Sequence, residues 1–389
     1  MGDWSDFNYD MLVLIAKRFN LIDDYLNFAS VCKSWRCAAT KENFNTNLAR
    51  VPWLMLAEEE GNSSRQLVSP YNGMIMKKKI PKASGKRCME TMGWLVTVGK
   101  DEGEISLLHP FSGVQIELPH QNTTENYHTH HQTGDLWTYF HKAVLSASPS
   151  HKSDYLLMVI EGDVKFLSYW RPGNLRWTRI INTSLHVPNR DVIYFDGKFY
   201  AVDGSGRVLV CDIESNQTQV VAQLARGYNY GNESYIVESL GTLFIVVREG
   251  LMLRYVTDDS ERIPLTLTQD DIFYDLDGEL TYGTTNIDVF EVDLVSGKLT
   301  QTKELGDRAF FIGHNASRSV QPSQFPGIKP NHIYFTDDYW ESYLVFEEGG
   351  GLDMGVFNLA DGTILPFPHY KGVSLSPVCP PTWVTPTLY

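Results

Sequence analysis

Apolar and polar residues follow two different periods along this chain. Over roughly the first 40 residues the apolar side chains recur every three or four positions, which places them on one face of a helix. From Leu67 onward they come in short runs, rich in β-branched and aromatic types and bounded by Gly, Pro, Asn and Asp, as in strands. We therefore predict a mainly β fold: a helical module over residues 1–45, a linker over 46–66 and one β domain over 67–389.

The helical module is predicted to contain three short helices. Asn8 can cap the first, and Asp10 places negative charge in its first turn, where the helix dipole favours it. A second helix begins near Asp23 and Asp24, and a third carries Trp35. The apolar face of the first helix contains Met11, Leu12, Ile15 and Phe19, and that of the second contains Leu26, Ala29 and Val31, with Phe28 beside it.

A helical unit of this size cannot bury all of its apolar residues alone. The module cannot bury all four of the large apolar residues Met11, Leu12, Phe28 and Trp35. Part of their surface is therefore expected to contact another protein or another part of the chain. Two interpretations remain open. The apolar surface contacts a partner protein, or it packs against the β domain of the same chain.

The β domain repeats one sequence unit, in which an apolar strand, a turn and a more polar strand follow one another. The unit occurs in LLHPFSGVQIELP, LVCDIESNQTQVV, FEVDLVSGKLTQT and VFNLADGTILPF. Short links such as Asp196-Gly197 are typical of hairpins. Repeats of this kind fit the four-stranded blades of a β-propeller.

The repeats predict a single propeller of about six blades, with about five to seven allowed. Blades are expected over residues 87–118, 139–181, 191–224, 234–304 and 309–367. Strands over 67–80 are left over, and they could complete a last blade with strands from the C-terminal end. Such a closed ring leaves no long open sheet edge. A β-sandwich is the alternative, although the repeated unit favours the propeller.

Composition and charge narrow the possible partners. The chain has 43% hydrophobic and 21% charged residues, as in ordinary folded proteins. Its net charge of −14 repels phosphate backbones, so nucleic acid is not expected as a main ligand. Five scattered cysteines without a C-x-x-C pair fit free thiols in a reducing compartment. Without a basic, apolar leader or a membrane-length apolar run, we expect a cytoplasmic or nuclear protein rather than a secreted or membrane protein.

Two groups of residues are candidates for metal binding or acid–base catalysis. His128, His130 and His131 could bind a metal, but their Asn-, Thr- and Gln-rich surroundings favour a solvated loop. Pairs of adjacent carboxylates could act as acid and base, but neighbours on a turn are expected to point to water. These pairs are Asp258-Asp259, Asp270-Asp271 and Asp337-Asp338.

No sequence motif points to catalysis or to a cofactor. The chain contains no G-x-S-x-G, no P-loop and no G-x-G-x-x-G before a helix, so we expect neither catalytic residues nor a bound cofactor or metal. Tryptophans in the β domain could line a recognition surface or fill the blade cores, and the second interpretation is favoured. They are Trp170, Trp177, Trp340 and Trp383.

The helical module resembles an F-box. The matching strings are Trp4-x-x-Phe7-x-x-Asp10-Met11-Leu12-x-x-Ile15 and Asp24-x-Leu26-x-Phe28-x-x-Val31-Cys32-Lys33-Ser34-Trp35-Arg36. The second string follows the family pattern closely, whereas the first has Phe7 in place of Leu and Asn8 in place of Pro. Pro starts a helix well, and Asn8 can serve as a cap instead. The family's Leu-Pro pair touches the adaptor, so this departure bears on the strength of that contact.

From about Trp4 to the C-terminal end, the chain resembles plant F-box proteins that carry a kelch-like β-propeller. The resemblance rests on PWLML, GWLVTVG, LLHPFSG, VIYFDGKFYAVD, SYIVES, LGDRAFFIGHNAS, FPGIKPNHIYFTDD, GVFNLADG and PPTWVTP. It implies a non-catalytic substrate-recognition subunit of a cullin-based SCF-type ubiquitin ligase. The helical module would bind a Skp-type adaptor and, through it, a cullin scaffold. Propeller loops would hold a target protein for ubiquitination.

The resemblance places the adaptor contacts on the helical module. The expected contacts are Phe7, Met11, Leu12, Ile15, Phe28, Val31 and Trp35. The alternative function is a propeller that binds glycans or hydrolyses a substrate and carries a degenerate F-box. That alternative predicts a polar central pocket with converging carboxylates.

Overall fold

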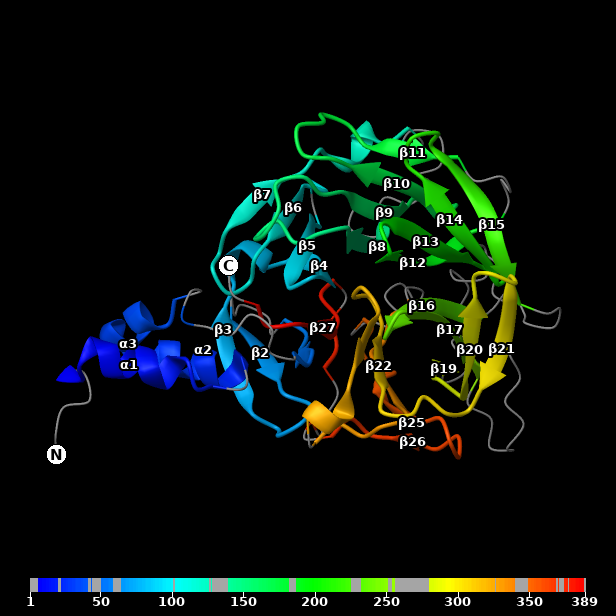
Figure 1. The fold of residues 1–389 in the computed structure, drawn as a ribbon. Helices are drawn as coiled ribbons and strands as arrows, with labels where there is room; N and C mark the ends of the chain where they lie inside the picture. Colours follow the sequence, from blue (N-terminus) through cyan, green and yellow to red (C-terminus); the bar gives the residue numbers. More distant parts are fainter. Residues whose placement is uncertain are drawn as a thin grey trace.

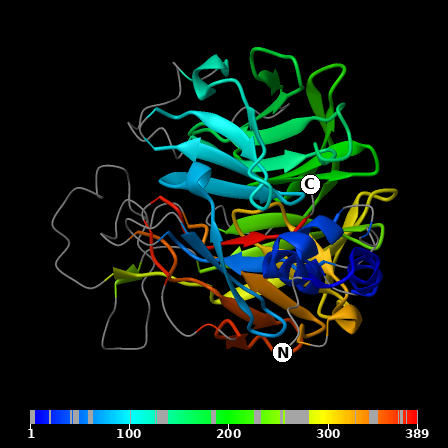
Figure 2. The same ribbon diagram turned by 90° about the vertical axis from the view of Figure 1, so that its left-hand side faces the viewer.

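The computed structural model places a small helical head beside a ring of β-sheets (Figures 1 and 2). It describes residues 6–19, 22–40, 43, 50–58, 64–100, 102–125, 127, 139–181, 187–224, 232–250, 254–255, 280–325, 327–339, 349–368, 370, 374–376 and 378–387. In Figure 1 the sheets follow one another clockwise from β2 and β3, and the helices lie outside the ring next to these strands. Within the described ranges, no helix has the length and apolar character needed to cross a bilayer.

The head consists, in its described part, of α1 (Tyr9–Ala16), α2 (Ile22–Val31) and α3 (Lys33–Ala38). Asn8 caps α1, as predicted, because its Oδ1 accepts a hydrogen bond from Asp10 N at 2.8 Å. One face of α1 is buried against α3. The core of the head is formed by Leu12, Ala16, Tyr25, Phe28 and Ala38.

The head hides more of its apolar surface than the sequence suggested. Leu12 and Phe28 are only 1% and 4% exposed, so the prediction that they exceed the capacity of the head is wrong. Aromatic packing explains the difference. The ring of Phe28 lies 4.6 Å from that of Trp35 and 5.3 Å from that of Phe19, and these rings enclose it.

The ring contains six large sheets in the part of the chain that the structure describes, which confirms the predicted propeller of about six blades. From innermost to outermost strand, the first three sheets are β27 (Thr382–Val384), β1 (Trp53–Met55), β2 (Ser64–Val68) and β3 (Ile75–Lys79); β4 (Lys86–Thr91), β5 (Trp94–Gly99), β6 (Ile105–Leu108) and β7 (Gln115–Glu117); and β8 (Phe140–Leu145), β9 (Leu157–Glu161), β10 (Phe166–Trp170) and β11 (Thr178–Ile180).

The remaining sheets complete the circle. They are β12 (Asn189–Phe195), β13 (Lys198–Asp203), β14 (Arg207–Asp212) and β15 (Gln217–Gln223); β16 (Glu233–Ser239), β17 (Thr242–Glu249), β20 (Asn286–Asp293) and β21 (Lys298–Thr302); and β23 (Arg318–Val320), β22 (Ala309–Ile312), β24 (His332–Phe335), β25 (Gly355–Asn358) and β26 (Ile364–Leu365). A separate two-stranded sheet consists of β18 (Arg254–Tyr255) and β19 (Leu280–Thr281). Short 3₁₀ helices are η3 (Pro81–Ala83), η4 (Gln121–Thr123) and η7 (Pro322–Gln324).

The first and last strands of the propeller close the ring. β27 pairs antiparallel with β1, with Leu54 opposite Trp383 and Met55 opposite Thr382. β1 and the start of β2 lie inside residues 46–66, for which the sequence predicts a linker. The first sheet therefore begins earlier than residue 67, because β1 is needed to pair with the returning strand. Closure in this way removes an open edge from the sheet.

The sixth sheet departs from the four-stranded pattern. β22 pairs antiparallel with β23 but parallel with β24, so the described part of this sheet has five strands. As a result the chain turns inward after β22, and β23 becomes the innermost strand. This inward excursion places residues 313–318 near the axis of the ring.

Apolar side chains fill the spaces between neighbouring sheets. The inner and middle strands are buried on both faces, which is why they read as continuous apolar runs such as WLVTVG. Trp170, Trp177 and Trp383 are 4%, 3% and 0% exposed, which confirms that they belong to blade cores. All five cysteines are free thiols, as predicted.

Candidate functional site

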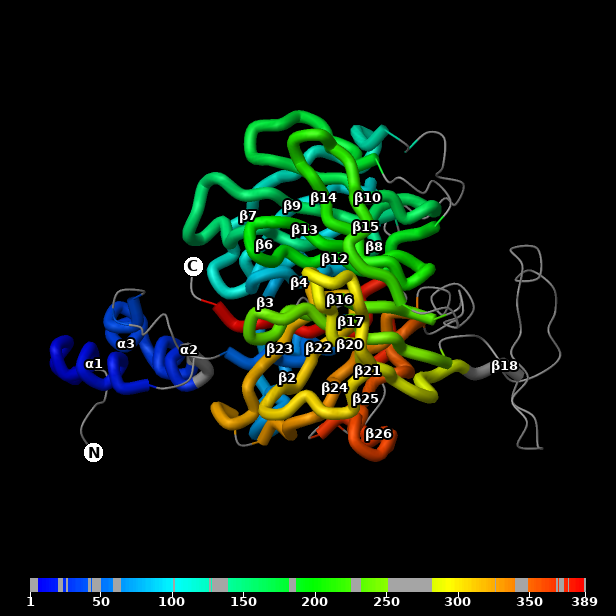
Figure 3. The backbone as a smooth tube through the Cα atoms, turned by 45° about the vertical axis from the view of Figure 1, so that its right-hand side comes forward, coloured from blue at the N-terminus to red at the C-terminus, as the bar shows by residue number. Residues whose placement is uncertain are grey.

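The innermost strands β27, β4, β8, β12, β16 and β23 surround the axis of the ring, and Figure 3 shows several of them side by side at its centre. Residues 313–317, here called the channel segment, run between them. Lys142 Nζ donates to the carbonyl of Gly313 at 2.8 Å, and Arg87 Nη2 lies 3.1 Å from His314 Nδ1. Ala316 N donates to the carbonyl of Glu90 at 2.7 Å. The space along the axis of the ring, here called the channel, is therefore filled by the chain itself.

Asp191 fastens four blades together at the axis. Its Oδ1 lies 3.1 Å from Lys142 Nζ on β8. Its Oδ2 accepts hydrogen bonds from Ile236 N on β16 at 3.0 Å and from Ser317 Oγ in the channel segment at 2.7 Å. Burial raises the pKa of Asp191, and the nearby Lys142 opposes that rise. Because its oxygens are held by several donors, this carboxylate serves as a structural clamp.

Glu90 makes a second clamp next to the channel segment. Its Oε1 accepts a hydrogen bond from Gly93 N at 2.7 Å and lies 3.4 Å from Thr385 N, next to the closing strand. Arg318 Nη1 lies 3.9 Å from the same oxygen and donates to Thr385 Oγ1 at 3.0 Å. Burial raises the pKa of Glu90. This clamp ties the second, sixth and first blades together.

The pair Asp337-Asp338 does not point to water, so the sequence-based interpretation of this pair is wrong. Asp337 is fully buried and accepts hydrogen bonds from Gly351 N at 2.7 Å and from the Tyr282 hydroxyl. Asp338 lies 3.0 Å from Arg248 Nη1, and burial raises its pKa to about 6. The two side chains join different networks, because consecutive residues after a strand point to opposite faces of the sheet.

One end of the channel, where the inner strands begin, is densely charged. A cavity of about 40 Å³ lies there, lined by Arg87, His141, Lys142, Lys165, Arg190, Glu233, Tyr235, Gly313, His314 and Asp338. Burial and the neighbouring cations lower the pKa of His141 and His314. A cavity of this size holds about one or two water molecules. It leaves no room for a sugar, so the central pocket with converging carboxylates that the glycan-binding or hydrolase alternative predicts is not found at this end of the channel, as far as the structure describes it.

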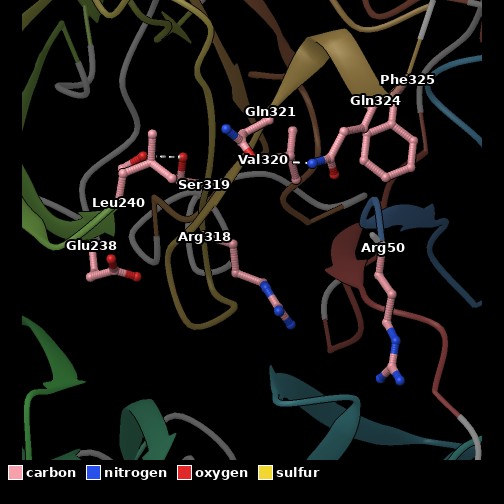
Figure 4. Close-up of a pocket in the computed structure, with 10 residues that line it drawn as sticks. Arg50, Glu238, Leu240, Arg318, Ser319, Val320, Gln321, Gln324 and Phe325 are labelled. Atoms are coloured by element: carbon pink, nitrogen blue, oxygen red, sulfur yellow. Dashed lines mark hydrogen bonds between the residues drawn. The ribbon is translucent and has the colours of Figure 1, made fainter. Parts of the chain in front are cut away.

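The other end of the channel, where the inner strands finish, carries a larger pocket of about 560 Å³ (Figure 4). We call it the mouth pocket. Its lining residues are Arg50, Glu238, Ser239, Leu240, Arg318, Ser319, Val320, Gln321, Gln324 and Phe325. They come from the end of β16 and the turn after it, from β23, from η7 and its flanking residues, and from Arg50 just before β1. Sequence reasoning missed this site, because its residues are far apart in the chain and follow no motif.

The structure divides the residues predicted to contact an adaptor into three groups, by their exposure. Phe7, Met11 and Val31 are 37%, 49% and 56% exposed, so they are accessible on the surface of the head. Ile15 and Trp35 are half-buried. Leu12 and Phe28 lie in the core of the head and support the surface from beneath.

Two exposed apolar residues on α1 were missed by sequence reasoning. Tyr9 and Leu14 are 52% and 55% exposed. Leu14 follows Met11 by three positions, so the two share one side of the helix. The spacing of Met11 and Leu14 was visible in the sequence, but the neighbouring Leu12 and Ile15 made a stronger pattern. We call Phe7, Tyr9, Met11, Leu14 and Val31 the exposed apolar set.

The residues of the exposed apolar set keep 37–56% of their surface open beside the described part of the propeller. The head touches the ring elsewhere, where Asn27 Nδ2 lies 3.1 Å from Met74 Sδ between β2 and β3. Figure 3 shows α2 nearest to the sheets and α1 and α3 farther away from them. Of the two interpretations of the surplus apolar surface, packing on the described part of the β domain does not apply to Met11, which is 49% exposed.

Some predicted residues lie outside the described part of the chain. They are His128, His130, His131, Asp258, Asp259, Asp270, Asp271 and Trp340. Among the described residues, no group of three or more His, Cys, Asp or Glu side chains is arranged to hold a metal ion.

Comparisons with known proteins agree with the arrangement of head and ring. Residues 67–358 match the family model of the KIB1-4 beta-propeller, and residues 4–47 match the F-box domain. The chain is 26% identical to the F-box protein SKIP23 of Arabidopsis thaliana, over 99% of this chain and 96% of that protein. It is 24% identical to the F-box protein At2g17036 of the same plant, over 99% of this chain and 95% of that protein. The chain therefore belongs to the F-box proteins that carry a KIB1-4 β-propeller.

Proposed function

We propose that this chain is the substrate-recognition adaptor of a cullin-based SCF-type ubiquitin ligase. The head binds a Skp-type adaptor, and through it a cullin scaffold, while the propeller holds a target protein. Holding both raises the local concentration of the ubiquitin-charged enzyme near lysines of the target. The chain itself performs no bond chemistry in this function.

The observation that carries the proposal is the exposed apolar set on a head that belongs to the F-box domain. Exposed apolar side chains that lie together on one surface mark an interaction site, and Met11 and Leu14 are neighbours on one side of α1. Met11, Leu14 and Val31 are each about half exposed or more although the propeller is present in the same chain. The core residues Leu12 and Phe28 fix the helices that present them.

A binding measurement with exposed-surface variants tests the proposal. The double variant Leu14→Asp/Val31→Asp should lower the affinity for a purified plant Skp-type adaptor by at least about tenfold, because burying one such side chain contributes about 1.5–3 kcal/mol. The head should still fold, since neither side chain belongs to its core. Substitution of Leu12 or Trp35 would be less informative, because it would disturb the packing of the head.

The matched control is Val295→Asp in the turn between β20 and β21. Val295 is 99% exposed, so this variant introduces the same carboxylate on an open surface of the propeller. It should bind the adaptor like the unmodified chain. Equal affinity of Leu14→Asp/Val31→Asp and Val295→Asp would refute the assignment of the apolar surface. Failure of the unmodified chain to bind any plant Skp-type adaptor would refute the function itself.

A further inference from the structure

The mouth pocket lies where the end of the channel meets the segment that arrives from the head. A second hollow of about 190 Å³ continues from it toward the channel, lined in part by Thr91, Leu145 and Tyr194 near the ends of β4, β8 and β12. The two hollows share Glu238, Arg318 and Ser319, so they form one groove. A groove that crosses several blades suits an extended peptide better than a compact small molecule.

Two arginines set the chemistry of the mouth pocket, and Figure 4 shows both side chains reaching into it. Burial and the nearby positive charge of Arg318 lower the pKa of Arg50. Among the described residues Arg50 makes no hydrogen bond or ion pair, whereas Arg318 donates to Thr385 Oγ1 and lies 3.9 Å from Glu90. Two like charges facing one hollow, in a chain of net charge −14, attract an anion.

The rim of the mouth pocket adds polar groups that can complete such a contact. Ser239 Oγ lies 2.7 Å from Ser319 Oγ, so the two hydroxyls sit together across blades five and six. Gln324 Nε2 donates to Gln321 Oε1 at 3.0 Å, which leaves the second amide hydrogen of Gln324 for another acceptor. Glu238 stands on the other side of the hollow and limits where a negative group can be placed.

Leu240 lines the pocket with an exposed apolar side chain and has a backbone conformation that leucine rarely adopts. It is 62% exposed, and it adopts a φ of 51° in the tight turn before Gly241. This turn position favours Asn, Asp or Gly, and the equivalent residue of the β12–β13 hairpin is Asp196, with a φ of 46°. Met92 has a φ of 51° at the same position of the β4–β5 hairpin and lines the second hollow, so an apolar residue stands at this turn position on both sides of the groove.

We propose that the mouth pocket binds an extended peptide segment of the target that carries an anionic group, a carboxylate or a phosphate, beside an apolar side chain. Arg50 and Arg318 hold the anionic group, and the apolar side chain rests on Leu240. Glu238 repels a second anion and so fixes the register of the peptide. This inference rests on the proposed function as a target-binding adaptor.

Four degenerate peptide libraries test the inference. Each has a fixed central residue, either Glu, phosphoserine, Ser or Lys, with random flanking positions, and each is passed over the immobilised full chain. The Glu or the phosphoserine library should be retained at least about tenfold more than the Ser and Lys libraries, because one charge-assisted contact changes affinity by about that factor. Sequencing of the bound peptides should show enrichment of apolar residues near the anion. Retention of only one of the two anionic libraries identifies the source of the charge.

Three variants separate the pocket from general electrostatics. Arg50→Gln should lower the retention of the anionic library about tenfold, and Glu238→Gln should raise it. The matched control is Arg176→Gln, which removes an exposed arginine from the turn between β10 and β11 and should change nothing. Arg50 lies before β1, outside any sheet, so its variant should melt like the unmodified chain.

The result that would overturn the inference is equal retention of all four libraries, or anionic retention that Arg50→Gln and Arg176→Gln affect alike. The same preparations are assayed for binding to the Skp-type adaptor. Adaptor binding without anionic selection removes this inference and leaves the proposed function intact. Anionic selection without adaptor binding refutes the proposed function and leaves a peptide-binding site whose ligand is not a ubiquitination target.

Discussion

Replacing Lys142 by methionine should remove one of the clamps that hold the blades around the axis. Methionine keeps the length of the side chain but loses the ammonium group. The lost contacts are those to Asp191 Oδ1 at 3.1 Å, to the carbonyl of Gly313 at 2.8 Å and to the face of Tyr235, 5.5 Å from Nζ. Lys142 and Asp191 are 4% and 0% exposed, so water does not replace these contacts.

The expected cost follows from the charge that the substitution leaves behind. Removing one partner of a buried ion pair costs about 3–5 kcal/mol, because the other charge stays buried without compensation. At about 2 °C per kcal/mol for a domain of this size, the melting temperature should fall by roughly 6–10 °C. Three hydrogen bonds to Asp191, from Val192 N, Ile236 N and Ser317 Oγ, remain and keep the loss from being larger.

The loss should depend on pH, with a sign that follows from Asp191. Burial raises the pKa of this carboxyl in the folded chain, and removing Lys142 takes away the charge that opposes the rise. The folded variant therefore takes up a proton at a pH at which the unfolded chain, with an ordinary carboxyl pKa of about 3.9, does not. The loss of folding stability in the variant is fully present above the raised pKa of Asp191 and becomes smaller as the pH falls below that pKa.

Urea unfolding followed by tryptophan fluorescence measures this at about pH 7.5 and at a lower pH, below the raised pKa of Asp191. The destabilisation should be smaller at the lower pH, and Asp191→Asn in the Lys142→Met background should recover part of the stability at the higher pH. The control is Lys198→Met, which removes an exposed lysine from β13. A destabilisation below about 1 kcal/mol, or one that neither the pH nor Asp191→Asn alters, would refute the clamp.

Three further predictions concern other parts of the chain. Asn8→Ala removes the cap of α1 and should cost the head about 1 kcal/mol, seen as faster amide exchange in α1 alone. Gly313→Ala places a methyl group against Thr336 Oγ1 at a φ of 146°, and should lower the urea midpoint, with part of the loss recovered by Thr336→Ala in the same chain. Trp383→Ala should cost about 3–5 kcal/mol by emptying a site at the ring closure, with limited proteolysis as the check that β27 detaches first.

The sequence predicted the ring well because each blade repeats a local signal. Turn residues such as Asp196-Gly197 recur between apolar runs, and spacing alone was enough to place the blades. The closing strand was also foreseen, since Leu67 to Ile80 was left without a blade of its own. The position of a hairpin is determined by residues that are close together in the chain, and such local patterns can be read from the sequence.

The channel segment and the two clamps could not be predicted in this way. The partners of Asp191 come from β8, β16 and the channel segment, which are separated by many residues and share no period. The head shows the same limit on a smaller scale. Helical spacing identified an apolar surface, but only the packing of Phe19 and Trp35 decides that Phe28 is buried while Val31 is exposed.

The pairing of β27 with β1 has a consequence for how the protein is made. The helices of the head have all been synthesised by Ala38, whereas the first sheet of the ring lacks its innermost strand until Val384 is available. At about 5–20 residues per second, roughly 20–70 s separate these two events on the ribosome. During that interval β1 presents an unpaired edge. The chain is therefore exposed to aggregation and proteolysis at the ring long after its head can fold, and any premature stop would leave the head without a closed ring.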